Sequence, residues 1–561
     1  MIRSFLVASV SALLIAGCGG GGGGGGTQST SAGSGGTSTG TGNTGTGGTT
    51  AVTNDPGLTL TPANLNINLI QSEVRSVSVD VHANRDFPEV VNILIADNGG
   101  LLVSKVNIEK QGTYNYRATF QVGAGVPPGV YTGFLEIRLC KDAPTVCSRP
   151  HDGSPWKLPY RVEVKATNQS ALKAMPGAVD WTVSRGNSAQ NAYVPVTLDA
   201  SKITPRFVYV MNNYQLNVVS GIATQNGKLF FTIGNTFSPG TGLYAVDENN
   251  GNLKWVYGFT GDYLGNVSVP DSRRPRNPGL GNGKVYVVGT IQYGDLVTMY
   301  AIDQTSGKLN AVTQINESMY TINHAPAPVT MDDTGLYFPT VGGISKFDST
   351  TLAKKWTYEA KPQLGLEYTV PLFDQASQYL YTSSITGGNN LTLDKIDKSS
   401  GTMVASVFLQ PSTRALCPDG GLMVVKNAGA SGSMLRLDGQ TMKTLWSIDD
   451  QFNAPFACSD TAIVAVNGKN LDVRSLSTGS LLWSLPVPEI ESFGLSGLIL
   501  TRNMLIFSTS TSVVAVDLNS HQRVWSFEQG GALSLSKNGI LYVSSTTYQG
   551  LDNKIFAFNL Q

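Results

Sequence analysis

A short strand-turn-strand pattern recurs along the C-terminal two thirds of the chain, and it constrains the fold more than any other feature. Its clearest copy runs from Leu243 to Trp255, with one strand ending at Asp247, a turn containing Gly251 and a second strand bearing the Trp. Successive Asp-equivalent positions are separated by about 45 residues on average, which is the length of a four-stranded propeller blade. In such a turn the Asp side chain accepts backbone hydrogen bonds and the Gly tolerates a positive φ. The period therefore predicts a ring of four-stranded blades.

The repeat has four characteristic positions: a small residue two before the Asp, the Asp itself, a Gly four residues later and a Trp eight residues later. In the five copies that carry the Trp, it lies eight residues after the Asp or after Ser475, which takes its place once. A small residue leaves space for a large ring to pack between neighbouring sheets. The candidate docking residues are Ala245, Asp247, Gly251, Trp255, Ala301, Asp303, Gly307, Asp348, Trp356, Asp397, Gly401, Asp438, Trp446, Gly479, Trp483, Ala515, Asp517 and Trp525.

The eighth copy, Ile555 to Asn559, lies so close to the C-terminus that it lacks a following strand. An unassigned strand-like segment, 203–210, precedes the first repeat. Joining the two in one blade removes the open sheet edges and closes the ring. We therefore predict an all-β chain in which residues 176–561 form an eight-bladed β-propeller, closed by strand 203–210 and preceded by a small β-sandwich.

The Ala-x-Asp pattern with its Gly and Trp resembles the tryptophan-docking motif of PQQ-dependent dehydrogenases and of the outer-membrane assembly lipoprotein family. The resemblance covers about residues 176–561 and implies a PQQ-like eight-bladed propeller. It says little about activity, because a shared fold hosts many functions.

The N-terminus has the features of a lipoprotein export signal. One Arg precedes an apolar run from Phe5 to Ile15, too short to span a bilayer, and the run ends in Leu-Ile-Ala-Gly-Cys18. This ending resembles the lipobox of bacterial lipoproteins, which implies a signal peptide at 1–17, lipidation of Cys18 and, with Gly19 following, an outer-membrane location facing the periplasm or the cell surface. An ordinary signal peptide with a chance cysteine is the alternative. Residues 18–56 are the lipidated Cys and a Gly/Ser/Thr-rich stretch that predicts a disordered tether.

Between residues 57 and 168 the sequence alternates apolar and polar residues, as half-buried strands do. About seven such runs predict a small sandwich. The stretch from Val126 to Gly133, with the strand that follows it, resembles the penultimate-strand entry of bacterial immunoglobulin-like modules. The resemblance implies an Ig-like spacer or adhesion domain.

With Cys18 assigned to lipid, four cysteines remain, and two disulfides are the natural expectation in an oxidising compartment. Cys140 and Cys147 flank a short loop. Cys417 and Cys458 occupy matching places in successive repeats, so neighbouring blades would bring them side by side. The histidines His82, His151, His324 and His521 are widely scattered, and no paired CxxC occurs, so we predict no metal site from these residues.

The sequence favours a non-catalytic binding scaffold over an enzyme. Acidic and basic residues are equal at 39 each, which gives no electrostatic case for nucleic acid. The adjacent cysteine pair of the quinoprotein dehydrogenases is absent, and so are hydrolase signatures; a PQQ- and Ca²⁺-dependent dehydrogenase, or another enzyme with its site in the channel, is the alternative. We expect no cofactor, a monomer anchored by lipid, and envelope or surface proteins or polysaccharide as partners. Three arginines in one long loop, Arg273, Arg274 and Arg276, are a candidate partner contact, with a solvated loop as the alternative.

Overall fold

The structure is a computed structural model, in which the chain divides into two compact units, Met1–Ala166 and Thr167–Gln561. It describes residues 5–8, 57–87, 91–97, 99–101, 106–123, 125–143, 146–183, 185–211, 218–234, 242–259, 263–264, 267–268, 277–290, 297–315, 329–340, 343–359, 370–386, 390–409, 413–428, 431–490, 495–545 and 553–561.

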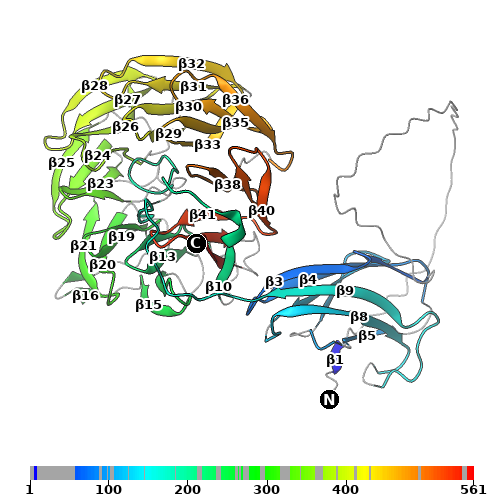
Figure 1. The fold of residues 1–561 in the computed structure, drawn as a ribbon. Helices are drawn as coiled ribbons and strands as arrows, with labels where there is room; N and C mark the ends of the chain where they lie inside the picture. Colours follow the sequence, from blue (N-terminus) through cyan, green and yellow to red (C-terminus); the bar gives the residue numbers. More distant parts are fainter. Residues whose placement is uncertain are drawn as a thin grey trace, which may run out of the picture. The chain divides into compact units, whose positions relative to one another are not determined.

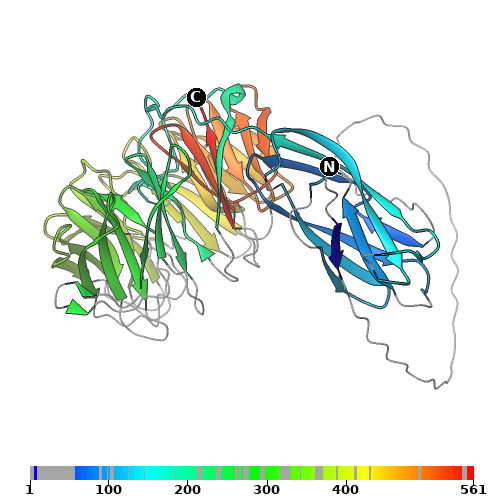
Figure 2. The same cartoon turned by 90° about the horizontal axis from the view of Figure 1, so that it is seen from below.

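The first unit consists of two sheets that share one core (Figures 1 and 2). Alternation decides which side chains enter the core: in β9 Trp156, Leu158, Tyr160, Val162 and Val164 are buried and the residues between them are more exposed. The unit is therefore a sandwich, and its Ig-like character stays a prediction. One sheet has the order β1 (Phe5–Ala8), β5 (Asn92–Asp97), β8 (Gly129–Cys140), β9 (Trp156–Lys165) and β3 (Leu65–Ile70), and the other β2 (Leu58–Thr61), β4 (Arg75–Ala83), β7 (Asn115–Val122) and β6 (Asn107–Lys110).

One strand of this unit falls in the predicted export signal. Phe5–Ala8 forms β1, which pairs antiparallel with β5 in the register Phe5 to Ala96.

The described residues of the second unit form eight antiparallel sheets arranged around a common centre (Figure 1), numbered here as blades 1 to 8. In chain order, blade 1 holds β12 (Ala223–Gln225), β13 (Lys228–Gly234), β14 (Gly242–Asp247) and β15 (Leu253–Gly258); blade 2 β18 (Gly279–Gly281), β19 (Lys284–Thr290), β20 (Val297–Asp303) and β21 (Leu309–Ile315); blade 3 β22 (Thr330–Asp332), β23 (Gly335–Thr340), β24 (Gly343–Phe347) and β25 (Lys354–Glu359); blade 4 β26 (Tyr379–Thr386), β27 (Asn390–Asp397) and β28 (Met403–Phe408); blade 5 β29 (Thr413–Leu416), β30 (Leu422–Ala428), β31 (Ser431–Leu437) and β32 (Thr444–Asp450); blade 6 β33 (Phe452–Cys458), β34 (Ala462–Asn467), β35 (Asn470–Ser475) and β36 (Leu481–Pro486); blade 7 β37 (Gly497–Leu500), β38 (Met504–Ser508), β39 (Val513–Asp517) and β40 (Arg523–Phe527); and blade 8 β41 (Ala532–Leu535), β42 (Ile540–Ser545) and β43 (Lys554–Asn559).

Smaller elements complete the unit. An isolated bridge between Leu372 and Tyr381 adds an inner segment to blade 4. The others are β11 (Val218–Val219), which pairs with β13, a two-stranded sheet of β16 (Tyr263–Leu264) and β17 (Val267–Ser268), and the 3-10 helix η1 (Ala200–Lys202).

Blade 8 receives its fourth strand from the start of the unit. β10 (Thr204–Val210) pairs antiparallel with β43, in a register from Thr204 opposite Asn559 to Val210 opposite Lys554. The outer strand of the last blade thus comes from ahead of the first blade, and the ring is closed by main-chain hydrogen bonds.

Candidate functional site

The predicted docking residues lie in the third and fourth strands of blades 1 to 7 and in the turn that joins these strands. In blade 2, Asp303 ends β20 and its Oδ1 accepts from the backbone N–H groups of Thr305 at 3.0 Å and Ser306 at 2.7 Å. Gly307 follows with φ +69°. The same position has positive φ even where the residue is Leu352, Met442 or His521. The turn therefore keeps its backbone shape in blades that lack the Gly.

A second reason for the glycine is contact with the preceding blade. A Cβ built on Gly307 would lie 2.6 Å from the Trp255 ring, and one on Gly401 would lie 2.7 Å from the Trp356 ring. Trp255 also donates its indole N–H to the Gln304 carbonyl in the next blade's turn at 3.2 Å. The Trp positions thus connect neighbouring blades. Trp356 donates in the same way to Lys398 and Trp446 to Leu476, while Trp483 stacks on His521 and Trp525 meets Phe558 edge-on.

Three blades have a long cation in place of the small residue, and sequence reasoning missed the consequence. Where blades 1, 2, 7 and 8 have Ala, blades 3, 4 and 5 have Lys346, Lys395 and Arg436. Each cation is buried and donates to carbonyl oxygens of the next blade's turn: Lys346 to Lys398 at 2.9 Å, Lys395 to Gln440 at 2.9 Å, and Arg436 to Leu476. Burial lowers the pKa of Lys346 and of Lys395. A long cation thus supplies an inter-blade bond that Ala cannot make.

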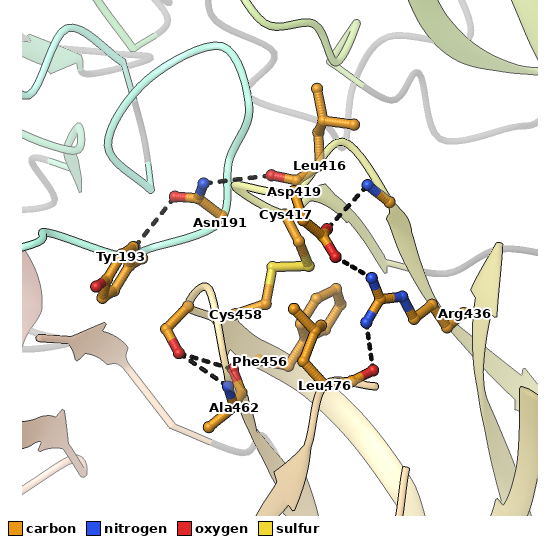
Figure 3. The surroundings of a disulfide bond; sticks show 12 residues. Asn191, Tyr193, Leu416, Cys417, Asp419, Arg436, Phe456, Cys458, Ala462 and Leu476 are labelled. Carbon is orange, nitrogen blue, oxygen red and sulfur yellow. Dashed lines mark hydrogen bonds and ion pairs between the residues drawn. A yellow bond between two sulfur atoms is a disulfide. The ribbon is translucent and has the colours of Figure 1, made fainter. Parts of the chain in front are cut away.

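Both predicted disulfides are present, Cys140–Cys147 and Cys417–Cys458. The second joins the inner strand ends of blades 5 and 6, with Cα atoms 5.6 Å apart (Figure 3). Asn191 lies beside it, donating from Nδ2 to the Leu416 carbonyl at 3.2 Å and accepting from the Cys458 N–H at 3.0 Å. The disulfide and Asn191 therefore hold the same two blades together.

Asn191 belongs to a segment that we call the strap, residues 175–198, of which all but 184 are described. The strap crosses the inside of the ring as the blue-green trace ahead of β10 (Figure 1). Its carbonyl groups accept from N–H groups of one blade after another, because inner strands are sheet edges whose polar groups need partners. The pairs are Trp181 with Thr224, Thr182 with Leu280, Ser188 with Phe373, Ala189 with Leu416, Asn191 with Cys458 and Ala192 with Leu500, and the Met175 N–H donates to Lys537 of blade 8.

Two arginines lie where the strap meets blades 4 to 6. Arg185 of the strap donates to the Arg414 carbonyl at 3.3 Å and to the Phe456 carbonyl at 2.6 Å, and its guanidinium lies 5.1 Å from the centre of the Phe456 ring. Arg414 of β29 donates to the Val370 carbonyl at 3.2 Å. Burial lowers the pKa of Arg185 to about 10 and of Arg414 to about 9. Both arginines remain cationic at neutral pH and tie inner strands together through carbonyl oxygens.

Beside the strap a pocket of about 250 Å³ opens among blades 1 to 4. Thr182 and Ser188 come from the strap, and the tight turns that follow the first strands of successive blades supply the other polar groups. The Asn282-Gly283 turn, with φ of +49° and +69°, is the favoured sequence for such a hairpin. Its polar side chains are those of Thr182, Ser188, Gln225, Asn282, Thr330, Asp332, Asp333 and Gln375.

The buried carboxylate of the pocket, Asp332, is already satisfied. It accepts from Thr334 Oγ1 at 2.6 Å and from Lys398 Nζ at 2.8 Å. Burial alone would raise the pKa of Asp332, but the hydrogen bonds from Lys398 and Thr334 lower it by more. The pKa of Asp332 therefore lies below its ordinary value. Asp333, next along the turn, is exposed.

Several expected site residues lie outside the described residues. These are Cys18 and the three loop arginines Arg273, Arg274 and Arg276. Within the described part of the chain, no three His, Cys, Asp or Glu side chains come together in a way that could hold a metal ion. Among the same residues, no helix is long and apolar enough to cross a membrane.

Residues 340–561, from blade 3 to the C-terminus, match the family model described as outer membrane protein assembly factor BamB. This match is consistent with a PQQ-like β-propeller. Solved structures similar to this chain include a quinohemoprotein alcohol dehydrogenase from Pseudomonas putida HK5, with 12% identity and a TM-score of 0.38 over 69% of this chain and 80% of that one. The dihydro-heme d1 dehydrogenase NirN has 14% identity and a TM-score of 0.41 over 60% of this chain and 75% of that one. No curated protein sequence matches the chain.

Proposed function

We propose that this protein is a non-catalytic lipoprotein of the outer membrane whose PQQ-like propeller acts as a binding scaffold for another envelope or surface component, a protein or a polysaccharide. The observation that carries the proposal is the pocket beside the strap, which gathers hydrogen-bonding side chains from separate blades at one surface. The match of residues 340–561 to an assembly-factor family supports a role in the envelope. Cys18 and the tether at 18–56 would hold the folded units at the membrane.

The strap makes this surface suitable for binding because it holds the turns in place before a ligand arrives. Its Trp181 and Thr182 carbonyls accept from blades 1 and 2, and its Ser188 carbonyl accepts from blade 4. Gln375 adds a side-chain bond to Ser188 at 3.3 Å and to the Met331 carbonyl at 3.0 Å. Groups fixed in this way lose little conformational entropy on binding, so more of the interaction free energy appears as affinity.

Crosslinking in intact envelopes followed by affinity capture of the full-length protein tests the scaffold role. We expect a discrete crosslinked product that is lost when the pocket residues Gln225 and Asn282 are replaced together by Ala and Gly. Capture of the isolated chain alone, under conditions in which known envelope partners are recovered, would contradict the proposal.

Three further measurements test the anchor, the exposure of the protein and the alternative function. Cys18→Ala should move the protein from the membrane fraction to the soluble fraction, and protease treatment of whole cells distinguishes surface from periplasmic exposure. Reconstitution with PQQ and Ca²⁺ tests the dehydrogenase alternative. A quinone absorption band together with dye-linked dehydrogenase activity would contradict the scaffold proposal and show that the protein is an enzyme.

A further inference from the structure

The polar and apolar groups that line the pocket beside the strap indicate which class of ligand it binds. This inference rests on the proposed scaffold function, because it names the ligand of the same surface. We propose that the pocket binds one sugar ring of a neutral glycan. Its volume of about 250 Å³ is below the ~300–1,000 Å³ of pockets for drug-sized ligands and suits a single ring.

Two of the amide side chains that line the pocket have one end without a hydrogen-bond partner among the described residues. Gln225 Oε1 accepts from Gln304 at 2.7 Å, and its Nε2 donates to none of the described residues. Asn282 Nδ2 donates to Ser349 Oγ at 3.3 Å, while within the same residues nothing donates to its Oδ1. The pocket therefore has at least one donor and one acceptor that are not used inside the described protein.

Sugar hydroxyls suit such a pair of groups because each hydroxyl both donates and accepts a hydrogen bond. The exposed Asp333 carboxylate adds a strong acceptor for a hydroxyl, since hydrogen bonds to ionised groups are stronger than neutral ones. Leu280, Val183 and Met331 line the same pocket and offer an apolar surface to the C–H face of a ring.

The charges of the pocket do not suit small ions. The described residues that line it include no Arg or Lys, so an anion would meet no opposite charge. Asp332 is paired with Lys398 at 2.8 Å and accepts from the Gly335 N–H at 3.2 Å, so its charge is already balanced inside the protein. One exposed carboxylate, Asp333, then remains for a cation that would need six or more oxygen ligands.

The test uses the purified propeller-containing chain and a panel of D-glucose, D-galactose and N-acetylglucosamine, with inorganic phosphate and CaCl₂ as competing probes. Saturation-transfer NMR identifies the binder and titration calorimetry gives its affinity, which we expect in the millimolar to high micromolar range. Asn282→Gly keeps the left-handed backbone and removes the amide. Asp333→Asn removes the charge and keeps an acceptor.

Each variant should weaken sugar binding about five- to tenfold, because Asn282→Gly loses one hydrogen bond and Asp333→Asn replaces a charged acceptor with a weaker neutral one. The matched control is Asp460→Asn, an exposed carboxylate in the corresponding turn of blade 6 that accepts from Tyr193 at 3.0 Å and lies outside the pocket. It should leave binding unchanged, and circular dichroism verifies that all variants fold.

Three outcomes would overturn the inference: no sugar binds to the folded wild-type chain, sugar binds with equal affinity to wild type and both pocket variants, or only phosphate or calcium binds. If a protein partner is crosslinked equally well to the wild type and to both pocket variants, the scaffold function is supported and the sugar site is contradicted. If no partner is captured from envelopes but sugar binds as expected, the sugar site is supported and the scaffold function is contradicted.

Discussion

Arg206 and Asn559 join the first strand of the ring to the last. Arg206 Nη1 donates to Asn559 Oδ1 at 2.8 Å, and the same guanidinium donates to the Glu248 carbonyl at 3.0 Å, to Asn249 Oδ1 at 2.7 Å and to the Ser170 carbonyl at 2.8 Å. One buried side chain therefore connects the closing strand, the C-terminal strand and blade 1.

Arg206→Ala should lower the free energy of unfolding by at least about 3 kcal/mol, because it leaves several buried acceptors without a donor. Urea denaturation followed by Trp fluorescence measures the change. Arg523→Ala is the control, since Arg523 is exposed and only loosely paired with Glu489 at 3.9 Å; its effect should stay within about 0.5 kcal/mol. Equal effects of the two substitutions would show that Arg206 does not secure the closure.

Gly479→Ala should destabilise the contact between blades 5 and 6. The new Cβ would lie 3.0 Å from the Trp446 ring and 2.8 Å from Ile448 Cδ1, at a φ of +73°. We expect a loss of about 2–4 kcal/mol by chemical denaturation, from the strained backbone and the displaced ring together. Gly420→Ala separates the two causes, because Gly420 has φ +82° and a Cβ placed on it would meet no described atom within 4 Å. It should cost only about 1 kcal/mol, and a similar loss in both variants would contradict the docking role.

The Cys417–Cys458 disulfide should stabilise the propeller by limiting the unfolded chain. It closes a loop with a sequence separation of 41, for which the loop-entropy relation gives about 4 kcal/mol. The double substitution Cys417→Ala and Cys458→Ala should lower the denaturation midpoint accordingly. The Cys140–Cys147 bridge has a separation of 7, so its double Ala variant is the comparison and should lose less. A smaller loss from the long loop than from the short one would argue against this explanation.

The motif carboxylates should make stability depend on pH in acid. Backbone N–H groups three residues further on hold the pKa of Asp303, Asp438 and Asp517 below the ordinary value. A carboxyl group whose pKa is lower in the folded than in the unfolded state stabilises the native state at pH values above the unfolded pKa of about 3.9. This stabilisation is lost as the pH falls through the pKa of the folded state. The free energy of unfolding should therefore fall from about pH 5 downward. Replacing all three Asp by Asn should flatten that slope, as unfolding curves at several pH values will show; an unchanged slope would refute the assignment.

The repeat by itself determined the ring. Asp303 and Gly307 predict a turn by their own chemistry, and Trp255 and Trp356 recur at a spacing that stacked blades explain. The same period placed Cys417 and Cys458 at equivalent positions, and the structure joins them in a disulfide. These features are local or periodic, so they can be read directly along the chain.

The candidate site was decided by tertiary structure alone. Gln225, Asn282, Asp333 and Gln375 each lie in or directly before an ordinary turn, about 50 residues apart, and nothing in any one turn indicates a ligand. The strap has no repeat and no regular strand pattern, because its carbonyl groups are paired with other segments rather than with neighbours in sequence. Closing the ring brings these turns to one surface, and only then do separate hydrogen-bonding groups become a pocket.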